Sequence, residues 1–278
     1  MNVLSKFALL PMLTLLIATG LPLSAGEKAH GQKVDQRSHF AVLHELEAGN
    51  ARFVSGATLY KPNLEERKEL ANGQKPHTIV LSCSDSRVPP ELIFDQGLGE
   101  LFTVRVAGNV VDEHVLASIE YAVEHLGSQF LVIMGHESCG AVKAALTTPK
   151  GKSAGSPSLD ELVGEIQSNL NGNTRFVDED PRLHEPVKAN VIAVAQQLVH
   201  ESPIIQEAIE HGQLMLAQGI YSLTSGEVEF WYVGRPELTQ ASASTKGNGH
   251  ASSTTSSKAV ISKKETPKSK KSTPKTVH

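Results

Sequence analysis

The central part of this chain alternates short apolar runs with amphipathic stretches, and this alternation limits the folds that it can adopt. Short apolar runs, partly β-branched, are typical of buried strands, whereas apolar residues at helical spacing indicate helices. The predicted strands are 77–81, 101–106, 130–134, 214–221 and 228–233. The predicted helices are 41–54, 111–126, 159–170, 186–200 and 204–211, with a further helix beginning near Pro90.

Strands that alternate with helices in this way predict parallel βαβ units with helices on both faces of the sheet. The last two predicted strands differ, because the short segment Thr224-Ser225-Gly226-Glu227 between them is a hairpin signal. The chain contains no internal repeat, no P-loop and no G-x-G-x-x-G pattern. We therefore expect one α/β domain with a mostly parallel central sheet.

The two ends of the chain differ in composition from the middle. Residues 1–25 have one lysine, an apolar stretch and small residues at the end, as in a secretory signal. We predict a signal peptide over 1–25, a folded domain over 26–238 and export to the periplasm or the medium. The alternative is an uncleaved N-terminal membrane anchor, although the apolar stretch is near the lower length limit for a span.

Residues 239–278 are rich in Ser, Thr and Lys, with eight lysines and one glutamate. Such a segment buries too little apolar surface to offset its ordering entropy, so we predict a disordered tail. One interpretation is a weak contact with an anionic surface, such as lipid, polysaccharide or nucleic acid. The other is a solvated extension. No specific nucleic-acid binding is expected.

The chain has only two cysteines, and each lies among residues typical of a zinc site. Cys83 opens the run Cys-Ser-Asp-Ser-Arg, and Cys139 follows His136 by three residues. Zinc prefers sulfur and nitrogen donors, and a catalytic zinc commonly has three protein ligands and one exchangeable position. We predict a zinc ion bound by Cys83, His136 and Cys139. The alternative for an exported chain is a disulfide between the two cysteines.

Asp85 and Arg87 lie close to the first cysteine and have two predicted roles. The Asp85 carboxylate can accept a hydrogen bond from a zinc-bound water, and Arg87 can hold that carboxylate ionised through a bidentate pair. Asp85 can also bind the metal itself and close the fourth position. Both cysteine motifs follow predicted strands, and ligands bind at the carboxyl ends of parallel strands.

Several motifs in this order resemble the β-class carbonic anhydrases. They are Cys83-Ser84-Asp85-Ser86-Arg87-Val88-Pro89, the run from Gly99 to Arg105, Ala107-Gly108-Asn109, Ser118 to Val123, Gly135 to Val142, and Glu45 to Phe53 near the start. The resemblance covers about residues 40 to 235. Arg105 matches the arginine of a regulatory bicarbonate pocket found in some members, whereas Val80 stands at the position of that pocket's tryptophan.

The resemblance implies one zinc ion per subunit, bound by Cys83, His136 and Cys139, with Asp85 and Arg87 as a catalytic dyad. It implies reversible hydration of carbon dioxide to bicarbonate and a proton, by attack of zinc-bound hydroxide. It also implies an antiparallel edge strand on the parallel sheet, and assembly as a homodimer or homotetramer with sites near the subunit interfaces.

Two other functions compete with this one. Enzymes of the same architecture hydrolyse carbonyl sulfide or carbon disulfide, and their zinc motifs look alike. A non-catalytic exported binding protein, with a structural disulfide between Cys83 and Cys139, is the alternative from another class. Zinc content and free thiols distinguish the enzyme from the binding protein.

Overall fold

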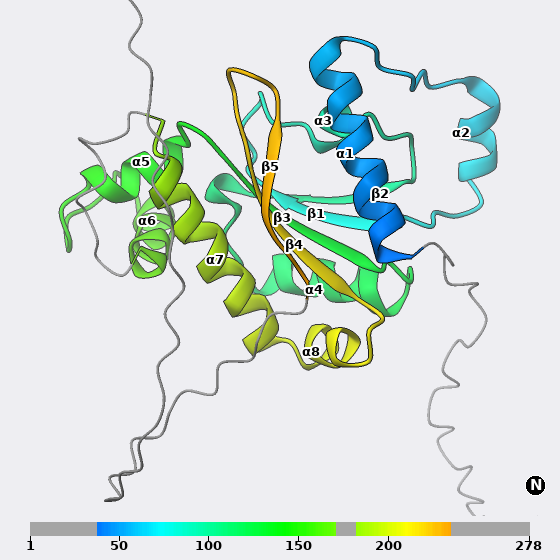
Figure 1. Ribbon diagram of the computed structural model, residues 1–278. Coiled ribbons are helices and arrows are strands. Elements are labelled where there is room, and N and C mark those ends of the chain that lie inside the picture. The colour runs from blue at the N-terminus through cyan, green and yellow to red at the C-terminus, as the bar shows by residue number, and fades with distance from the viewer. Residues whose placement is uncertain (1–37, 171–181, 235–278) are drawn as a thin grey trace, which may run out of the picture. The chain divides into compact units, whose positions relative to one another are not determined.

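The computed structural model describes residues 38–170 and 182–234, and these residues form a five-stranded sheet with the order β2-β1-β3-β4-β5 (Figure 1). The strands are β1 (Thr78–Ser82), β2 (Leu101–Arg105), β3 (Phe130–His136), β4 (Met215–Tyr221) and β5 (Val228–Gly234). Strand β1 pairs parallel with β2 and β3, β3 pairs parallel with β4, and β5 pairs antiparallel with β4. The predicted α/β class and its antiparallel edge strand are confirmed.

Helices connect the parallel strands and cover the sheet. They are α1 (His39–Ser55), α2 (Leu64–Leu70), α3 (Pro90–Ile93), α4 (Glu113–Glu124), α5 (Gly140–Thr147), α6 (Pro157–Asn169), α7 (His184–Glu201) and α8 (Pro203–Glu210), with a 3₁₀ turn η1 at Ala107–Asn109. In Figure 1, α4 and α8 lie on one side of the sheet and α1 and α3 on the other. The predictions from sequence did not include α2 or α5.

Each face of the sheet has its own apolar core, because successive side chains of a strand point to opposite faces. Ile79 and Leu81 of β1 pack into a cluster with residues of α4, α7 and α8. Val80, between them, packs instead with Val42 and Leu46 of α1. All five residues of β1 are buried, as expected for a strand covered on both faces.

Side-chain caps set several of the helix ends. The Ser38 hydroxyl accepts a hydrogen bond from the Ala41 amide at the start of α1, and the Asp112 carboxylate accepts from the amides of His114 and Val115 at the start of α4. Such caps satisfy amides that have no partner within the helix. The cap at Asp112 explains why α4 begins two residues later than its apolar pattern predicts.

No helix in the described part of the chain has the length and apolar character that crossing a membrane requires. The predicted signal peptide at 1–25 and the predicted tail at 239–278 both lie outside the described residues. Export and tail contacts therefore stay predictions.

Candidate metal centre

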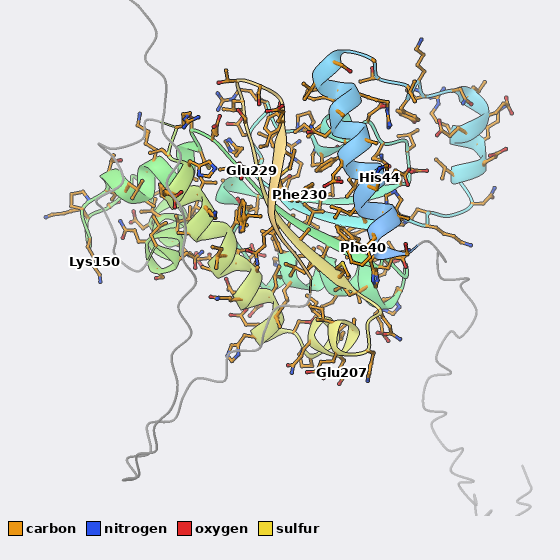
Figure 2. All side chains as sticks on the ribbon, in the orientation of Figure 1. Phe40, His44, Lys150, Glu207, Glu229 and Phe230 are labelled. Atoms are coloured by element: carbon orange, nitrogen blue, oxygen red, sulfur yellow. The ribbon has the colours of Figure 1, made fainter. Side chains whose placement is uncertain are left out.

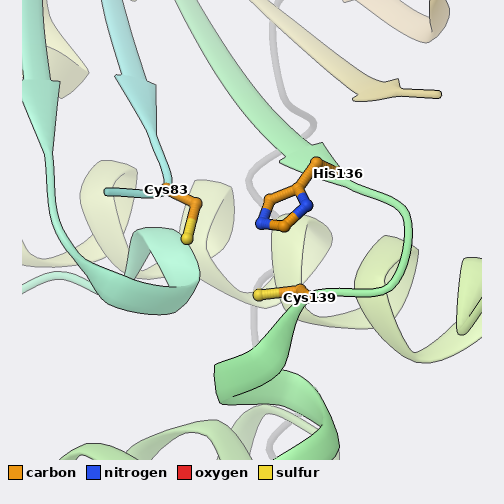
Figure 3. A group of neighbouring side chains, drawn as sticks. All are labelled: Cys83, His136 and Cys139. Atoms are coloured by element: carbon orange, nitrogen blue, oxygen red, sulfur yellow. The ribbon is translucent and has the colours of Figure 1, made fainter. Parts of the chain in front are cut away.

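Three potential metal ligands meet at the carboxyl ends of the parallel strands (Figure 3). Cys83 follows the last residue of β1, His136 is the last residue of β3, and Cys139 immediately precedes α5. Because β1 and β3 are parallel neighbours, their ends bring Cys83 and His136 to the same point. The three ligand atoms all lie within 4.8 Å of one another, and all three residues are buried.

The turn between His136 and Cys139 is held by main-chain hydrogen bonds. The Glu137 amide donates to the Tyr221 carbonyl (3.0 Å), and the Ser138 amide donates to the Arg182 carbonyl (2.6 Å). Ser138 has a left-handed backbone with φ of 54°. A non-glycine residue rarely adopts this conformation, so the surrounding contacts must stabilise it. In Figure 3 the Cys139 sulfur lies below the His136 ring and points toward the side where the Cys83 sulfur lies.

The two ring nitrogens of His136 have different surroundings. Its Nδ1 lies 2.9 Å from the Glu137 carbonyl oxygen, which fixes the proton on Nδ1. Its Nε2 is buried and has no hydrogen-bond partner among the described residues. A buried polar atom without a partner is costly, and a metal ligand commonly has its other ring nitrogen fixed in this way. The imidazole is therefore arranged as a metal ligand.

The two cysteine thiols have pKa values that are shifted in opposite directions. A hydrogen bond from Cys139 lowers the pKa of Cys83 to about 4, and contacts with His136 and the Gly108 amide add to this effect. The same hydrogen bond, with burial, raises the pKa of Cys139 well above its usual range. Ionisation of both Cys83 and Cys139 would place two negative charges side by side in a buried site, and a nearby cation is needed to stabilise them. Two sulfurs and one nitrogen are a donor set that suits zinc, with a fourth position left over.

Asp85 and Arg87 form an ion pair beside the three ligands. Arg87 Nε donates to Asp85 Oδ1 (2.9 Å) and Nη2 donates to Oδ2 (2.7 Å), and the Arg87 amide donates to Oδ1 as well (2.9 Å). The guanidinium holds the pKa of Asp85 well below its ordinary value. Asp85 Oδ2 lies 3.9 Å from His136 Nε2. The structure thus places Asp85 next to the ligand cluster but pairs it with Arg87.

Arg105 supports the loop that contains Cys83 and Asp85. Its Nε donates to the Cys83 carbonyl oxygen (3.1 Å), and its Nη2 donates to the Asp85 carbonyl oxygen (2.6 Å). Because Arg105 comes from the end of β2, the neighbouring strand fixes the shape of this loop. From the sequence, Arg105 was matched only to the arginine of a bicarbonate pocket. Its support of the loop that contains Cys83 and Asp85 was not predicted.

Two further residues contact the site and were not predicted from the sequence. The Gly108 amide donates to the Cys83 sulfur (3.4 Å), and the Asn190 side chain donates to the Gly108 carbonyl (2.8 Å). Gly108 has a φ of 67°, and a Cβ there would lie 2.7 Å from the Ile166 side chain. The motif Ala107-Gly108-Asn109 signalled a turn, but the contact of its amide with sulfur depends on the tertiary structure.

Known proteins resemble this chain over most of the described region. A carbonic anhydrase family model matches residues 78–228, more than half of the chain. The carbonic anhydrase of Mycolicibacterium smegmatis is 38% identical over 194 residues, which cover 68% of this chain and 91% of that protein. Carbonic anhydrase 2 of Mycobacterium tuberculosis strain H37Rv is 38% identical over 187 residues, covering 67% and 89%.

Solved structures agree with the sequence relatives. A structure from a study of two tetrameric β-carbonic anhydrases of Sordaria macrospora has a TM-score of 0.55 at 26% identity, covering 68% of this chain and 96% of that one. The Coccomyxa β-carbonic anhydrase in complex with acetazolamide has a TM-score of 0.54 at 25% identity, covering 70% and 83%.

The fold and the site define an α/β protein with a cysteine–histidine–cysteine cluster at the carboxyl ends of parallel strands. This chain belongs to the β-carbonic anhydrase family. The predicted family is confirmed, and with it the prediction that the chain is an enzyme of the carbonic anhydrase class.

Proposed function

We propose that this chain hydrates carbon dioxide reversibly to bicarbonate and a proton, with zinc held by Cys83, His136 and Cys139. The observation that carries the proposal is the buried His136 Nε2, which has no hydrogen-bond partner among the described residues and belongs to a cluster with two buried thiols. Zinc, when bound, supplies a Lewis acid that lowers the pKa of a water.

The Asp85 carboxylate is the group that orients the water for reaction. Because its pKa lies well below the ordinary value, Asp85 stays ionised at any physiological pH and accepts a hydrogen bond from the water. That hydrogen bond turns an oxygen lone pair toward the carbon of carbon dioxide. The water oxygen forms the new bond to carbon, and its proton leaves to solvent, so that one water and one carbon dioxide give one bicarbonate and one proton.

Arg87 has the role of positioning that carboxylate. Two side-chain hydrogen bonds and one from the main chain restrain both oxygens of Asp85. Charge-assisted bidentate pairs of this kind fix geometry as well as charge. We propose that Asp85 also serves as a fourth zinc ligand in a resting form, which requires its release from Arg87. The equilibrium between the two roles then determines how much enzyme is ready to react.

Stopped-flow measurement of carbon dioxide hydration across pH tests the proposed function. We expect low activity of the wild type near neutrality and higher activity at alkaline pH. Asp85→Asn should keep zinc but lose at least about 100-fold in kcat/KM, since an amide cannot replace an ionised acceptor. Cys83→Ser should lose zinc as well as activity. A wild type with bound zinc that is inactive at every pH would refute the proposal.

Two parallel measurements address the competing functions. Carbonyl sulfide offered to the same preparation should react far more slowly than carbon dioxide, and the reverse order would assign the other hydrolase activity. Thiol titration after denaturation should give two free thiols per chain, because Cys83 and Cys139 are both free in the structure. A disulfide in freshly purified protein without zinc would favour the non-catalytic binding protein.

We also propose that the chain assembles as a homodimer or homotetramer. The support is twofold: the Sordaria macrospora relatives are described as tetrameric, and large apolar side chains are exposed on the described surface. Exposed apolar side chains gathered in one region are common at interfaces between subunits.

A further inference from the structure

The sulfur of Cys83 accepts hydrogen bonds from the main chain as well as facing the other two candidate ligands. The donors are the amides of Gly108 (3.4 Å) and Asp85. Asp85 belongs to the same loop as Cys83, whereas Gly108 lies in η1, which follows the neighbouring strand β2. The contact from Gly108 therefore depends on the parts of the structure that hold η1 against the sulfur.

The main chain of Gly108 is restrained by packing and by hydrogen bonds. A Cβ at this position would lie 2.7 Å from the Ile166 side chain, so the residue has little room to move. Glycine itself has wide conformational freedom, and packing alone does not fix the direction of its peptide groups. The peptide group that follows it is held at both ends. The Asn109 amide donates to the Val106 carbonyl (2.9 Å), and the Asn190 side chain donates to the Gly108 carbonyl (2.8 Å).

Asn190 is a polar residue on an apolar helix face. It is fully buried, and the other buried residues of α7 are apolar. A polar side chain in such a place needs its hydrogen bonds, because an unpaired buried amide is costly. Its nitrogen donates to Gly108, and its oxygen accepts from the side chain of Asn169 on α6 (2.9 Å). Both ends of the Asn190 amide are thus engaged, and its orientation is fixed.

The same face of α7 also packs against the strand that carries the histidine ligand. Gly135 directly precedes His136, and a Cβ there would lie 2.5 Å from the Val187 side chain and 2.8 Å from that of Val191. The helix therefore touches the main chain beside His136. Through Asn190 it also holds the peptide whose neighbouring amide contacts Cys83.

A hydrogen bond to a thiolate changes how much charge the sulfur gives to a metal ion. The amide hydrogen draws electron density from the sulfur, so the ion retains more of its Lewis acidity. Hydrogen bonds to sulfur tune iron–sulfur clusters in this way. Groups that hold metal ligands in place contribute about 10–100-fold to metal affinity or activity. Two thiolates already neutralise the charge of a zinc ion, so this hydrogen bond matters at such a site.

We propose that Asn190 is a positioning residue of the zinc site. It holds the Gly108 peptide so that the amide donates to the Cys83 sulfur, and Asn169 holds Asn190 in turn. This role rests on the proposed zinc ligands and goes beyond them, because Asn190 is not itself a ligand. An asparagine with a purely structural role would stabilise the fold and leave the properties of the bound metal unchanged.

Two measurements on the full-length protein test this role. They are the rate of zinc release to a chelator and the near-ultraviolet absorption of the cobalt(II)-substituted protein. Asn190→Leu has a similar volume but cannot donate to the Gly108 carbonyl, and it should release zinc at least about tenfold faster than the wild type. Its thiolate-to-cobalt charge-transfer band should move to longer wavelength, because a sulfur without the hydrogen bond gives up an electron more easily.

Asn169→Leu changes the outer, half-buried residue of the pair and provides a milder variant. It should show the same two changes to a smaller extent, since Asn190 keeps its donor group but loses its fixed orientation. This variant tests the proposal even where Asn190→Leu does not fold. Wild-type zinc release together with a wild-type cobalt band in the folded variants would overturn the proposal.

Asn50→Leu is the matched control. Asn50 is also a buried asparagine that donates to main-chain carbonyls, but it lies on α1, which covers the other face of the sheet from α7. It should lower the Tm, as Asn190→Leu does, yet keep the wild-type zinc release and cobalt band. Equal metal effects in both variants would overturn the proposal. Neither measurement requires carbon dioxide, so both decide the role of Asn190 even where the hydration assay refutes the proposed function.

Discussion

At the scale of single residues, the proposed chemistry depends on the guanidinium of Arg87 holding the Asp85 carboxylate. Both oxygens of Asp85 accept hydrogen bonds from Arg87, while Oδ2 also lies 3.9 Å from His136 Nε2. The ion pair therefore keeps Asp85 beside the cluster without placing it among the three ligands. The proposed reactive and resting forms differ mainly in this one contact.

Replacement of Arg87 by Gln should release Asp85. We expect zinc to be retained and kcat/KM to fall at least about 100-fold, because the carboxylate loses its fixed position. Stopped-flow hydration with metal analysis on the same samples measures both quantities. Arg87→Lys should recover part of the activity, since it restores the charge but not the bidentate geometry. Arg67→Gln, an exposed arginine on α2, serves as the control and should behave as the wild type.

The same variant has a testable pH signature in stability. Arg87 depresses the folded-state pKa of Asp85, so the ion pair stabilises the protein fully above the unfolded pKa, about 4. This contribution is lost as the pH falls further toward the folded value. The wild type should therefore lose more stability than Arg87→Gln on acidification below about pH 4. Denaturant unfolding from pH 7 down to pH 3 checks this, and parallel curves for the two proteins would contradict the assigned pair.

The sequence predicted the residue types at the site but not all of their contacts. Cys83, His136 and Cys139 were predicted as one ligand set from their residue types and spacing, and the ends of two predicted parallel strands placed the two motifs together. The contact of the Gly108 amide with sulfur could not be predicted, because it depends on how η1 folds over the end of β1. The sequence likewise left open whether Asp85 pairs with Arg87 or binds the metal, because the side-chain geometry decides between the two.

At the scale of elements, the docking of α1 against the end of α3 depends on Gly49, a residue without a side chain. A Cβ at Gly49 would lie 1.8 Å from the Phe94 carbonyl oxygen, so the main chains of the two elements touch there. Asn50, the next residue, donates to the carbonyls of Ile93 and Gly226 and accepts from the Val228 amide. The helix thus joins the end of α3 to the start of β5.

Gly49→Ala should destabilise the protein, because the main-chain contact leaves no room for a methyl group. We expect the free energy of unfolding to fall by about 2 kcal/mol, as for other overpacked positions. Urea unfolding at fixed protein concentration measures the change. Gly164→Ala is the matched control, since a Cβ at that position in α6 meets nothing within 4 Å. It should stabilise by about 0.5–1 kcal/mol, and a loss of stability equal to that of Gly49→Ala would contradict the docking argument.

Long periodic elements were predicted well, and short ones were missed for physical reasons. The apolar runs of β1 and β3 indicate buried strands because both faces of the sheet are covered. The helix α2 has seven residues, none of them buried, so it has no apolar face to detect. The helix α5 begins at Gly140, directly after a metal-ligand motif, where the small residues gave no clear period. Side-chain caps and turns, rather than periodicity, determine where these elements start and stop.

At the scale of the whole molecule, the candidate metal ligands gather at the carboxyl ends of the central strands of the sheet. Cys83 and His136 stand at the ends of β1 and β3, and Cys139 comes from the turn before α5. In the strand order β2-β1-β3-β4-β5, neither β1 nor β3 is an edge strand. The site therefore depends on the buried middle of the sheet, where the parallel register holds the two strand ends side by side.

The surface formed by the first helices is the best candidate for contact between subunits. Four of the large exposed apolar residues in the described part of the chain, Phe40, Val54, Leu59 and Leu64, lie within residues 40–64. Phe40, labelled on α1 in Figure 2, is 70% exposed. Burial of such a side chain in an interface contributes about 1.5–3 kcal/mol, which corresponds to about ten- to a hundredfold in the dissociation constant.

Phe40→Asp should therefore weaken self-association of the full chain at least about tenfold. Sedimentation equilibrium over a range of protein concentrations measures the dissociation constant directly. Leu159→Asp is the control, because Leu159 is an exposed apolar residue on α6, outside the segment formed by residues 40–64. It should leave assembly unchanged.

Equal weakening by both variants would place the interface elsewhere, and a wild type that stays monomeric at micromolar concentration would contradict assembly itself. Loss of assembly without loss of zinc in Phe40→Asp would show that the cysteine cluster forms within one subunit, as its three ligands from one chain require.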